Sequence, residues 1–147
     1  MMLSIIDNIR GNALDKGIIM KIVHESQVPE IQVPGRYLRW IADAKSLQPE
    51  FLTSCVMRVA PGETVRPAHA HPDGEELIYV INGEGKVYVD GEVQPLRPGV
   101  AVLFQKNCIH MVRNSGNEEM KVICFFAPPA SLDTYEFHPE VSFPEEM

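Results

Sequence analysis

The sequence predicts an all-β domain with a sandwich or barrel architecture, and three observations support this fold class. Twelve prolines and ten glycines are spread over 147 residues, which is typical of many short elements rather than a few long helices. Strand-length segments rich in β-branched and aromatic residues recur, and no long helical period interrupts them. Turn dipeptides separate these segments at Asn82-Gly83, Asp90-Gly91, Pro98-Gly99 and Ser115-Gly116.

About eight strands follow from this pattern. They are expected at residues 36–42, 53–60, 75–82, 86–90, 92–96, 100–104, 109–113 and 120–127. In the second of these segments, the alternation of side chains puts Cys55 and Met57 on an inward face. It puts Ser54, Val56 and Arg58 on the opposite face, and the charge of Arg58 marks that face as the wetter one.

The chain is expected to form one domain, residues 1–147, because its length is that of a single domain of ordinary size. A short helical turn is expected at residues 3–11. Residues 129–147 carry several prolines among acidic and aromatic side chains, and we expect an irregular tail that packs across the barrel or a partner subunit. This tail and the segment before Trp40 carry apolar residues that a small barrel leaves partly exposed, which predicts a homodimer.

The composition argues against two classes of partner. Thirteen Lys and Arg residues oppose 20 Asp and Glu residues, so the formal net charge is −7 and no basic block is present. Binding to nucleic acid or to a membrane surface is therefore not expected. The cysteines, Cys55, Cys108 and Cys124, are odd in number and match no metal-ligand spacing. Together with the absence of a signal-peptide pattern, they predict free thiols in a reducing cytoplasm.

Two histidines provide the first chemical signal. His69 and His71 lie two residues apart, so in an extended chain both imidazoles project to the same face and can grip one ion. Such a pair is a weak motif by itself. Glu76 opens the next expected strand, and His110 lies in a strand far downstream.

With their neighbouring glycines, these residues resemble the two motifs of the cupin superfamily. The first motif is matched by Gly62, His69, His71, Glu76 and Gly83, with six residues instead of five between Gly62 and His69. The second motif is matched by Gly99, His110 and Asn114. Gln105 and Asn107 stand where the family has proline and glycine. Asparagine tolerates the left-handed backbone conformation that glycine provides at such a position.

The resemblance covers about residues 35–128 and implies a double-stranded β-helix, which is a jelly-roll barrel of about eight strands with a short N-terminal extension. It also implies that His69, His71, Glu76 and His110 hold one divalent transition metal ion. Three imidazoles and one carboxylate suit iron, manganese, nickel, copper or zinc, and the donor set does not choose among them. The resemblance gives no matching position for a general acid or base, so the catalytic residues stay unassigned.

An ion held in this way keeps open positions, which predicts a metalloenzyme that acts on a small chelating organic molecule. Dioxygenase-type oxidation and metal-enolate lyase or isomerase chemistry are both compatible with the site. A non-enzymatic module that binds a small molecule or sugar is the alternative. An epimerase of phosphorylated sugars would need basic residues inside the barrel. Its candidates are Arg39, Arg58, Arg66 and Arg113, although the strand phase puts Arg58 outside.

The walls of the expected pocket are apolar. Phe104 and Phe126 fall on the inward phase of their strands, where they fill the core or exclude water from a ligand. Asp73 and Glu75, near the expected ligands, are interpreted as solvated loop charges rather than as acceptors for the histidine rings.

Overall fold

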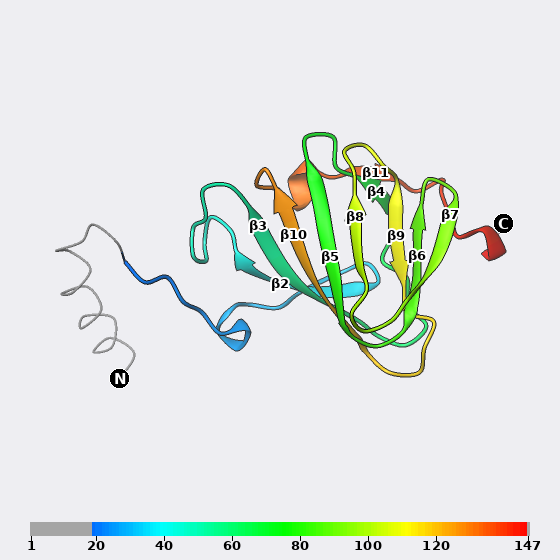
Figure 1. Cartoon of the computed structure of the whole chain (residues 1–147), viewed down its shortest axis with the longest axis horizontal. Helices are drawn as coiled ribbons and strands as arrows, with labels where there is room; N and C mark the ends of the chain where they lie inside the picture. Colours follow the sequence, from blue (N-terminus) through cyan, green and yellow to red (C-terminus); the bar gives the residue numbers. More distant parts are fainter. Residues whose placement is uncertain (1–18, 147) are drawn as a thin grey trace.

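The computed structural model describes residues 19–146, and nearly all of its regular structure is β (Figure 1). The helical turn expected at residues 3–11 lies outside this part of the chain. The strands are β1 (Ile31–Val33), β2 (Arg36–Ala42), β3 (Thr53–Val59), β4 (Ala68–Ala70), β5 (Glu75–Asn82), β6 (Gly85–Val89), β7 (Glu92–Leu96), β8 (Ala101–Phe104), β9 (His110–Arg113), β10 (Met120–Ala127) and β11 (Glu136–His138). Three short 3₁₀ helices accompany them: η1 (Glu25–Gln27), η2 (Leu132–Thr134) and η3 (Pro144–Glu146).

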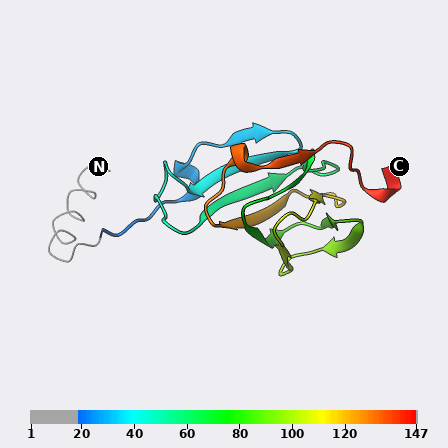
Figure 2. The ribbon, with the colours of Figure 1, turned by 90° about the horizontal axis from the view of Figure 1, so that it is seen from above.

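The strands form two antiparallel sheets that face each other, as the view in Figure 2 shows. The order in the six-stranded sheet is β1-β2-β3-β10-β5-β8, and the order in the five-stranded sheet is β11-β4-β9-β6-β7. Neighbours in each sheet are mostly distant in the sequence, which is the crossover pattern of a jelly roll. The predicted all-β double-stranded β-helix is therefore confirmed.

All eight predicted strands are present, each within one residue of its predicted bounds. The sequence analysis missed β1, β4 and β11, which are three residues long. Strands this short carry no alternation to detect, and they form because a neighbouring strand offers them hydrogen-bond partners.

The hydrophobic core fills the space between the two sheets. Along β5, buried and exposed residues alternate from Glu75 to Val80, so one face of the strand turns to the core and the other to solvent. The centre of the core is fully buried and includes Val59, Val80, Met120 and Val122. These aliphatic side chains help to hold the sheets together through the hydrophobic effect.

The outward face of β3 is the wetter of its two faces, as predicted, because Arg58 is the one residue of the strand that is not buried. Ser54 and Val56 on the same face are nevertheless buried. Residues 25–30 lie against this part of the sheet. The outward-facing arginines hold this segment through an ion pair between Arg58 and Glu30, at 2.6 Å, and a hydrogen bond from Arg39 to the Val28 carbonyl, at 2.7 Å.

A different part of the same sheet carries an exposed apolar row. Phe125 on β10, Leu77 on β5 and Leu103 on β8 are register partners across three neighbouring strands. Their exposed fractions are 37%, 42% and 51%. Tyr79 and Ile81 extend this outer apolar row along β5, and both are exposed.

Residues 129–147 are more regular than expected, since β11 pairs with β4 through Phe137 opposite His69. The expectation of a wholly irregular tail was wrong because this pairing depends on a strand about 70 residues away in sequence, which local pattern does not report. The tail does pack across the barrel. Phe143 is fully buried against Ala68 and Met111.

Candidate metal centre

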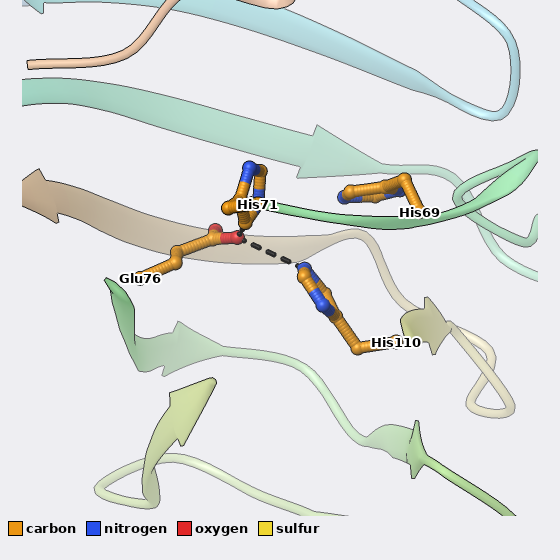
Figure 3. Close-up of side chains that lie close together, drawn as sticks. All are labelled: His69, His71, Glu76 and His110. Atoms are coloured by element: carbon orange, nitrogen blue, oxygen red, sulfur yellow. Dashed lines mark hydrogen bonds and ion pairs between the residues drawn. The ribbon is translucent and has the colours of Figure 1, made fainter. Parts of the chain in front are cut away.

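The two sheets supply the candidate site jointly. His69 lies on β4 and His71 follows that strand directly, while His110 lies on β9 as the register partner of His69. Glu76 comes from β5 in the opposite sheet. Figure 3 shows the four side chains directed toward one point between the sheets.

The geometry of these four residues is that of a single site. One ligand atom from each residue, a ring nitrogen or a carboxylate oxygen, lies within 4.8 Å of the corresponding atoms of the other three. All four side chains are buried. The structure therefore brings together the residues that the motif spacing singled out.

Hydrogen bonds to the backbone orient the rings of two of the histidines, His69 and His110. The Nδ1–H groups of His69 and His110 donate to the carbonyl oxygens of Pro67 and Cys108, each at 3.1 Å. A carbonyl can only accept, so these bonds fix the proton on Nδ1 and leave Nε2 to act as a ligand. This arrangement fits a metal ion.

The carboxylate of Glu76 contacts two of the three histidines. Its Oε1 lies 2.9 Å from His71 Nε2 and 3.1 Å from His110 Nε2 (Figure 3). Burial raises the pKa of Glu76, but the hydrogen bonds from His110 and His71 outweigh it and hold this pKa well below its ordinary value. Glu76 is therefore an anion at neutral pH.

The pKa values of His69 and His110 are shifted in opposite directions. Burial lowers the pKa of His110, but the hydrogen bonds with Cys108 and Glu76 overcome this and raise that pKa to about 9. Burial and the positive charge of His110 lower the pKa of His69 to about 3. In the ion-free protein, one proton therefore lies between His110 and Glu76, where a cation would replace it.

Asn107, which stands where the family has glycine, takes the backbone conformation expected of it. Asn107 has a φ of 68°, in the left-handed region. The backbone N–H of Asn107 donates to the His71 carbonyl at 3.1 Å. This hydrogen bond connects the turn before His110 to the first motif. Asn114 is fully buried, and its Nδ2 donates to the carbonyls of Val59 and Glu118. Its role is to hold the loop after β9.

The centre opens onto a small cavity of about 20 Å³. A space of this size accommodates about one water molecule or ion. Phe104 and Phe126 line it, as their inward phase predicted, and so do Cys55 and Met57. The walls are mainly apolar, so a charged group inside is poorly solvated.

Tyr135 closes one side of this cavity and was not singled out by the sequence. Its ring stacks on His69, with centroids 4.9 Å apart and planes at 17°, and its edge contacts His71. Within residues 19–146 its hydroxyl has no hydrogen-bond partner, and burial raises the pKa of Tyr135 well above its ordinary value. No signal marked it, because it lies in the tail where no alternation or motif is present.

The other polar candidates lie outside the cavity. Asp73 and Glu75 are exposed, as expected of loop charges. Arg39 and Arg58 pair with Glu30 on the outer face, Arg66 is exposed, and Arg113 pairs with Glu145. None of the four arginines proposed for phosphate binding lines the cavity, so the epimerase alternative loses its candidate residues.

Comparison with known proteins addresses the family directly. The Cupin domain family model matches residues 55–126, which include all four converging side chains. This chain belongs to the cupin superfamily. The free thiols expected at Cys55, Cys108 and Cys124 are present as such. In residues 19–146, no helix is long and apolar enough to cross a membrane.

Similar proteins include cupins of several activities. The chain is 36% identical over 80 residues to polyketide synthase CurC of Streptomyces cyaneus, covering 54% of this chain and 50% of that protein. It is 38% identical over 55 residues to L-ectoine synthase of Vibrio campbellii, covering 37% and 43% respectively. The aligned regions thus span half or less of these relatives.

Among solved structures, the polyketide cyclase RemF of Streptomyces resistomycificus superimposes with a TM-score of 0.64. The identity is 21%, and the match covers 74% of this chain and 80% of RemF. At this identity the likeness concerns the fold.

The first prediction concerns how much each donor contributes to metal binding. We expect His110→Ala and Glu76→Ala each to lower the metal content of the purified protein severely, because one removes a ligand from a distant strand and the other removes the one anionic donor. The barrel should stay folded, since its core is aliphatic. Elemental analysis with circular dichroism and thermal melts checks this, with His138→Ala as control. Two variants that are both metal-free and unfolded would contradict a functional site.

The second prediction concerns the proton that is released when a metal ion binds. Because the pKa of His110 is raised to about 9, this ring is protonated at neutral pH and an ion must displace its proton. Metal binding near pH 7 should release about one proton, and the affinity should rise up to tenfold per pH unit until about pH 9. Calorimetry in two buffers of different ionisation enthalpy measures the release. An affinity independent of pH in this range contradicts the prediction.

Proposed function

We propose that this chain is a metal-dependent enzyme that carries out lyase or isomerase chemistry on a small chelating organic molecule, at a carbon next to a carbonyl group. The observation that carries the proposal is the convergence of four buried donors on one point, three of which line a mainly apolar cavity. In this proposal His69, His71, Glu76 and His110 are the ligands of one divalent transition metal ion. The described barrel would form the catalytic part of a single domain, residues 1–147.

The curated relative CurC supports this class of reaction. It is named as a polyketide synthase, and polyketide chains alternate carbonyl and methylene groups. The hydrogens between two carbonyl groups are acidic, and the enolised form of such a unit chelates metal ions. A site with open positions on one ion suits a substrate of this kind.

Three side chains around the cavity, Tyr135, Phe104 and Phe126, have distinct parts in the proposed reaction. When bound, the ion supplies a Lewis acid that polarises the chelating carbonyl. Tyr135 keeps its phenolic proton because burial raises its pKa, so it can donate a hydrogen bond to an oxygen on which negative charge develops. Phe104 and Phe126 exclude water and so strengthen that hydrogen bond.

The third prediction tests this activity with pyruvate, whose methyl protons exchange slowly in D₂O. We expect the metal-loaded protein to accelerate this exchange, measured by proton NMR. Tyr135→Phe should slow it about 10²-fold, the usual effect of removing one oxyanion donor, while its metal content stays unchanged. Tyr79→Phe is the matched control, because Tyr79 lies on the exposed face of β5.

Exchange no faster than that caused by the free ion would contradict the proposal and favour a non-enzymatic binding module. Oxygen uptake with the same substrate, recorded with an oxygen electrode, would assign dioxygenase-type oxidation instead. Anaerobic and aerobic titrations of the loaded protein separate these outcomes.

We also propose that the chain acts in the cytoplasm as a homodimer. Cys55, Cys108 and Cys124 are free thiols, which suits a reducing compartment. The apolar tail and N-terminal segment that first suggested a dimer are partly satisfied within the chain, through Phe143 and Val28. The outer apolar row remains exposed, and a second copy can cover it by a symmetric face-to-face contact.

The fourth prediction follows from this row. Light scattering at micromolar concentration should give twice the 16.5 kDa mass of one chain. Leu77→Lys and Leu103→Lys together should shift the mass to that of one chain, because two charges would be buried in an apolar contact. Phe51→Lys, an equally polar change at an exposed site in the loop between β2 and β3, should leave the dimer intact. A wild-type protein of single-chain mass contradicts the proposal.

A further inference from the structure

Arg36 is a buried arginine at the edge of the candidate metal centre. It is the first residue of β2, and its side chain shares the inward face of that strand with Leu38. Its exposed fraction is 6%. The cavity that it lines is the one that contains His69, Glu76 and His110.

Most of the hydrogen-bonding capacity of this guanidinium is unused. Its Nη1 donates to the carbonyl oxygens of Pro34, at 3.0 Å, and Arg66, at 3.3 Å. A guanidinium carries five N–H donors. Within residues 19–146, its Nε and Nη2 groups have no hydrogen-bond partner. The two backbone carbonyls thus bind Nη1 and leave Nε and Nη2 available to a ligand.

The charge of Arg36 also lacks a counter-ion. In the described part of the chain no carboxylate forms an ion pair with it, whereas Arg39 and Arg58 both pair with Glu30. Burial lowers the pKa of Arg36, but a guanidinium remains protonated in proteins. The donor atoms of Arg36 that lack a protein partner are not fully buried, so water can reach them. A cation held in this way, without a counter-ion, can exchange that water for an anion.

The proposed metal ion adds to this imbalance. A divalent ion and the single carboxylate of Glu76 leave a net charge of about +1 at the centre, and Arg36 contributes a second positive charge to the same cavity. The walls offer mainly apolar side chains, including Leu38, Ile78 and Phe126. An anionic ligand would neutralise both positive groups at once.

We propose that Arg36 binds a carboxylate group of the substrate, which is therefore a small organic acid that chelates the metal ion through its other end. The planar guanidinium matches a carboxylate in shape and can form two parallel hydrogen bonds with it. The inference rests on the proposed function for the ion, while the role of Arg36 rests on its own burial and contacts.

Ligand binding to the cobalt-loaded protein tests the proposal without any assay of activity. Two dicarboxylates, oxalate and malonate, are compared by calorimetry with acetohydroxamate, a chelator that has no carboxylate. Arg36→Met should weaken the tighter dicarboxylate about tenfold to hundredfold, the usual effect of losing a charged hydrogen bond. The affinity for acetohydroxamate should change less than about twofold.

Two further variants sharpen the comparison. Arg36→Lys keeps the charge but not the planar fork, so it should bind the dicarboxylate with intermediate affinity, and it also serves if the methionine variant does not fold. Arg39→Met is the matched control, because that arginine pairs with Glu30 on the outer face. It should bind all three probes as the wild type does.

The outcomes separate the two proposals. A wild-type protein that takes up no metal contradicts the proposed function. If the wild type and Arg36→Met hold equal metal, and dicarboxylate affinity is unchanged, the role of Arg36 is wrong and the metal site stands. An equal loss for dicarboxylate and hydroxamate would mean that Arg36 only shapes the centre, which also contradicts a carboxylate anchor.

Discussion

The buried carboxylate of Glu76 is the constraint on which the rest of the site depends. A charge inside an apolar barrel is stable only when donors surround it, and here His71 and His110 supply them from the opposite sheet. Their orientation in turn requires the carbonyl of Cys108 and the left-handed turn at Asn107. One electrostatic requirement thus fixes the spacing of β4, β5 and β9. The aliphatic core then needs only to hold two sheets at that distance.

The sequence is informative about elements whose signal is local. Alternation and turn dipeptides locate eight strands, because each long strand has one dry face and each turn requires residues such as glycine. The four converging donors could be predicted because their spacing, together with that of neighbouring turn glycines, matches the two cupin motifs. The short strand β4, which carries His69, was missed because its three residues become extended only by pairing with β9 and β11.

Two cavity residues escaped the sequence analysis for different reasons. Arg36 could have been found, since alternation along residues 36–42 puts it in phase with the inward residue Leu38. A charge at an inward position of a strand is a usable signal. Tyr135 could not have been found in this way. Its position follows from the return of residues 129–147 across β4, and nothing in the local pattern of the tail reports that path.

The strand and tail that complete the cavity both lie outside the segment that identifies the family. Residues 55–126 contain the four converging donors, but they contain neither Arg36 nor Tyr135. An alignment restricted to this segment therefore compares the scaffold and the ion site of related proteins. It leaves out two of the side chains that would contact a substrate. A protein trimmed to those boundaries would lose both ends of the cavity wall. Substitutions at Arg36 or Tyr135 would therefore change the lining of the cavity without altering the segment that carries the four donors.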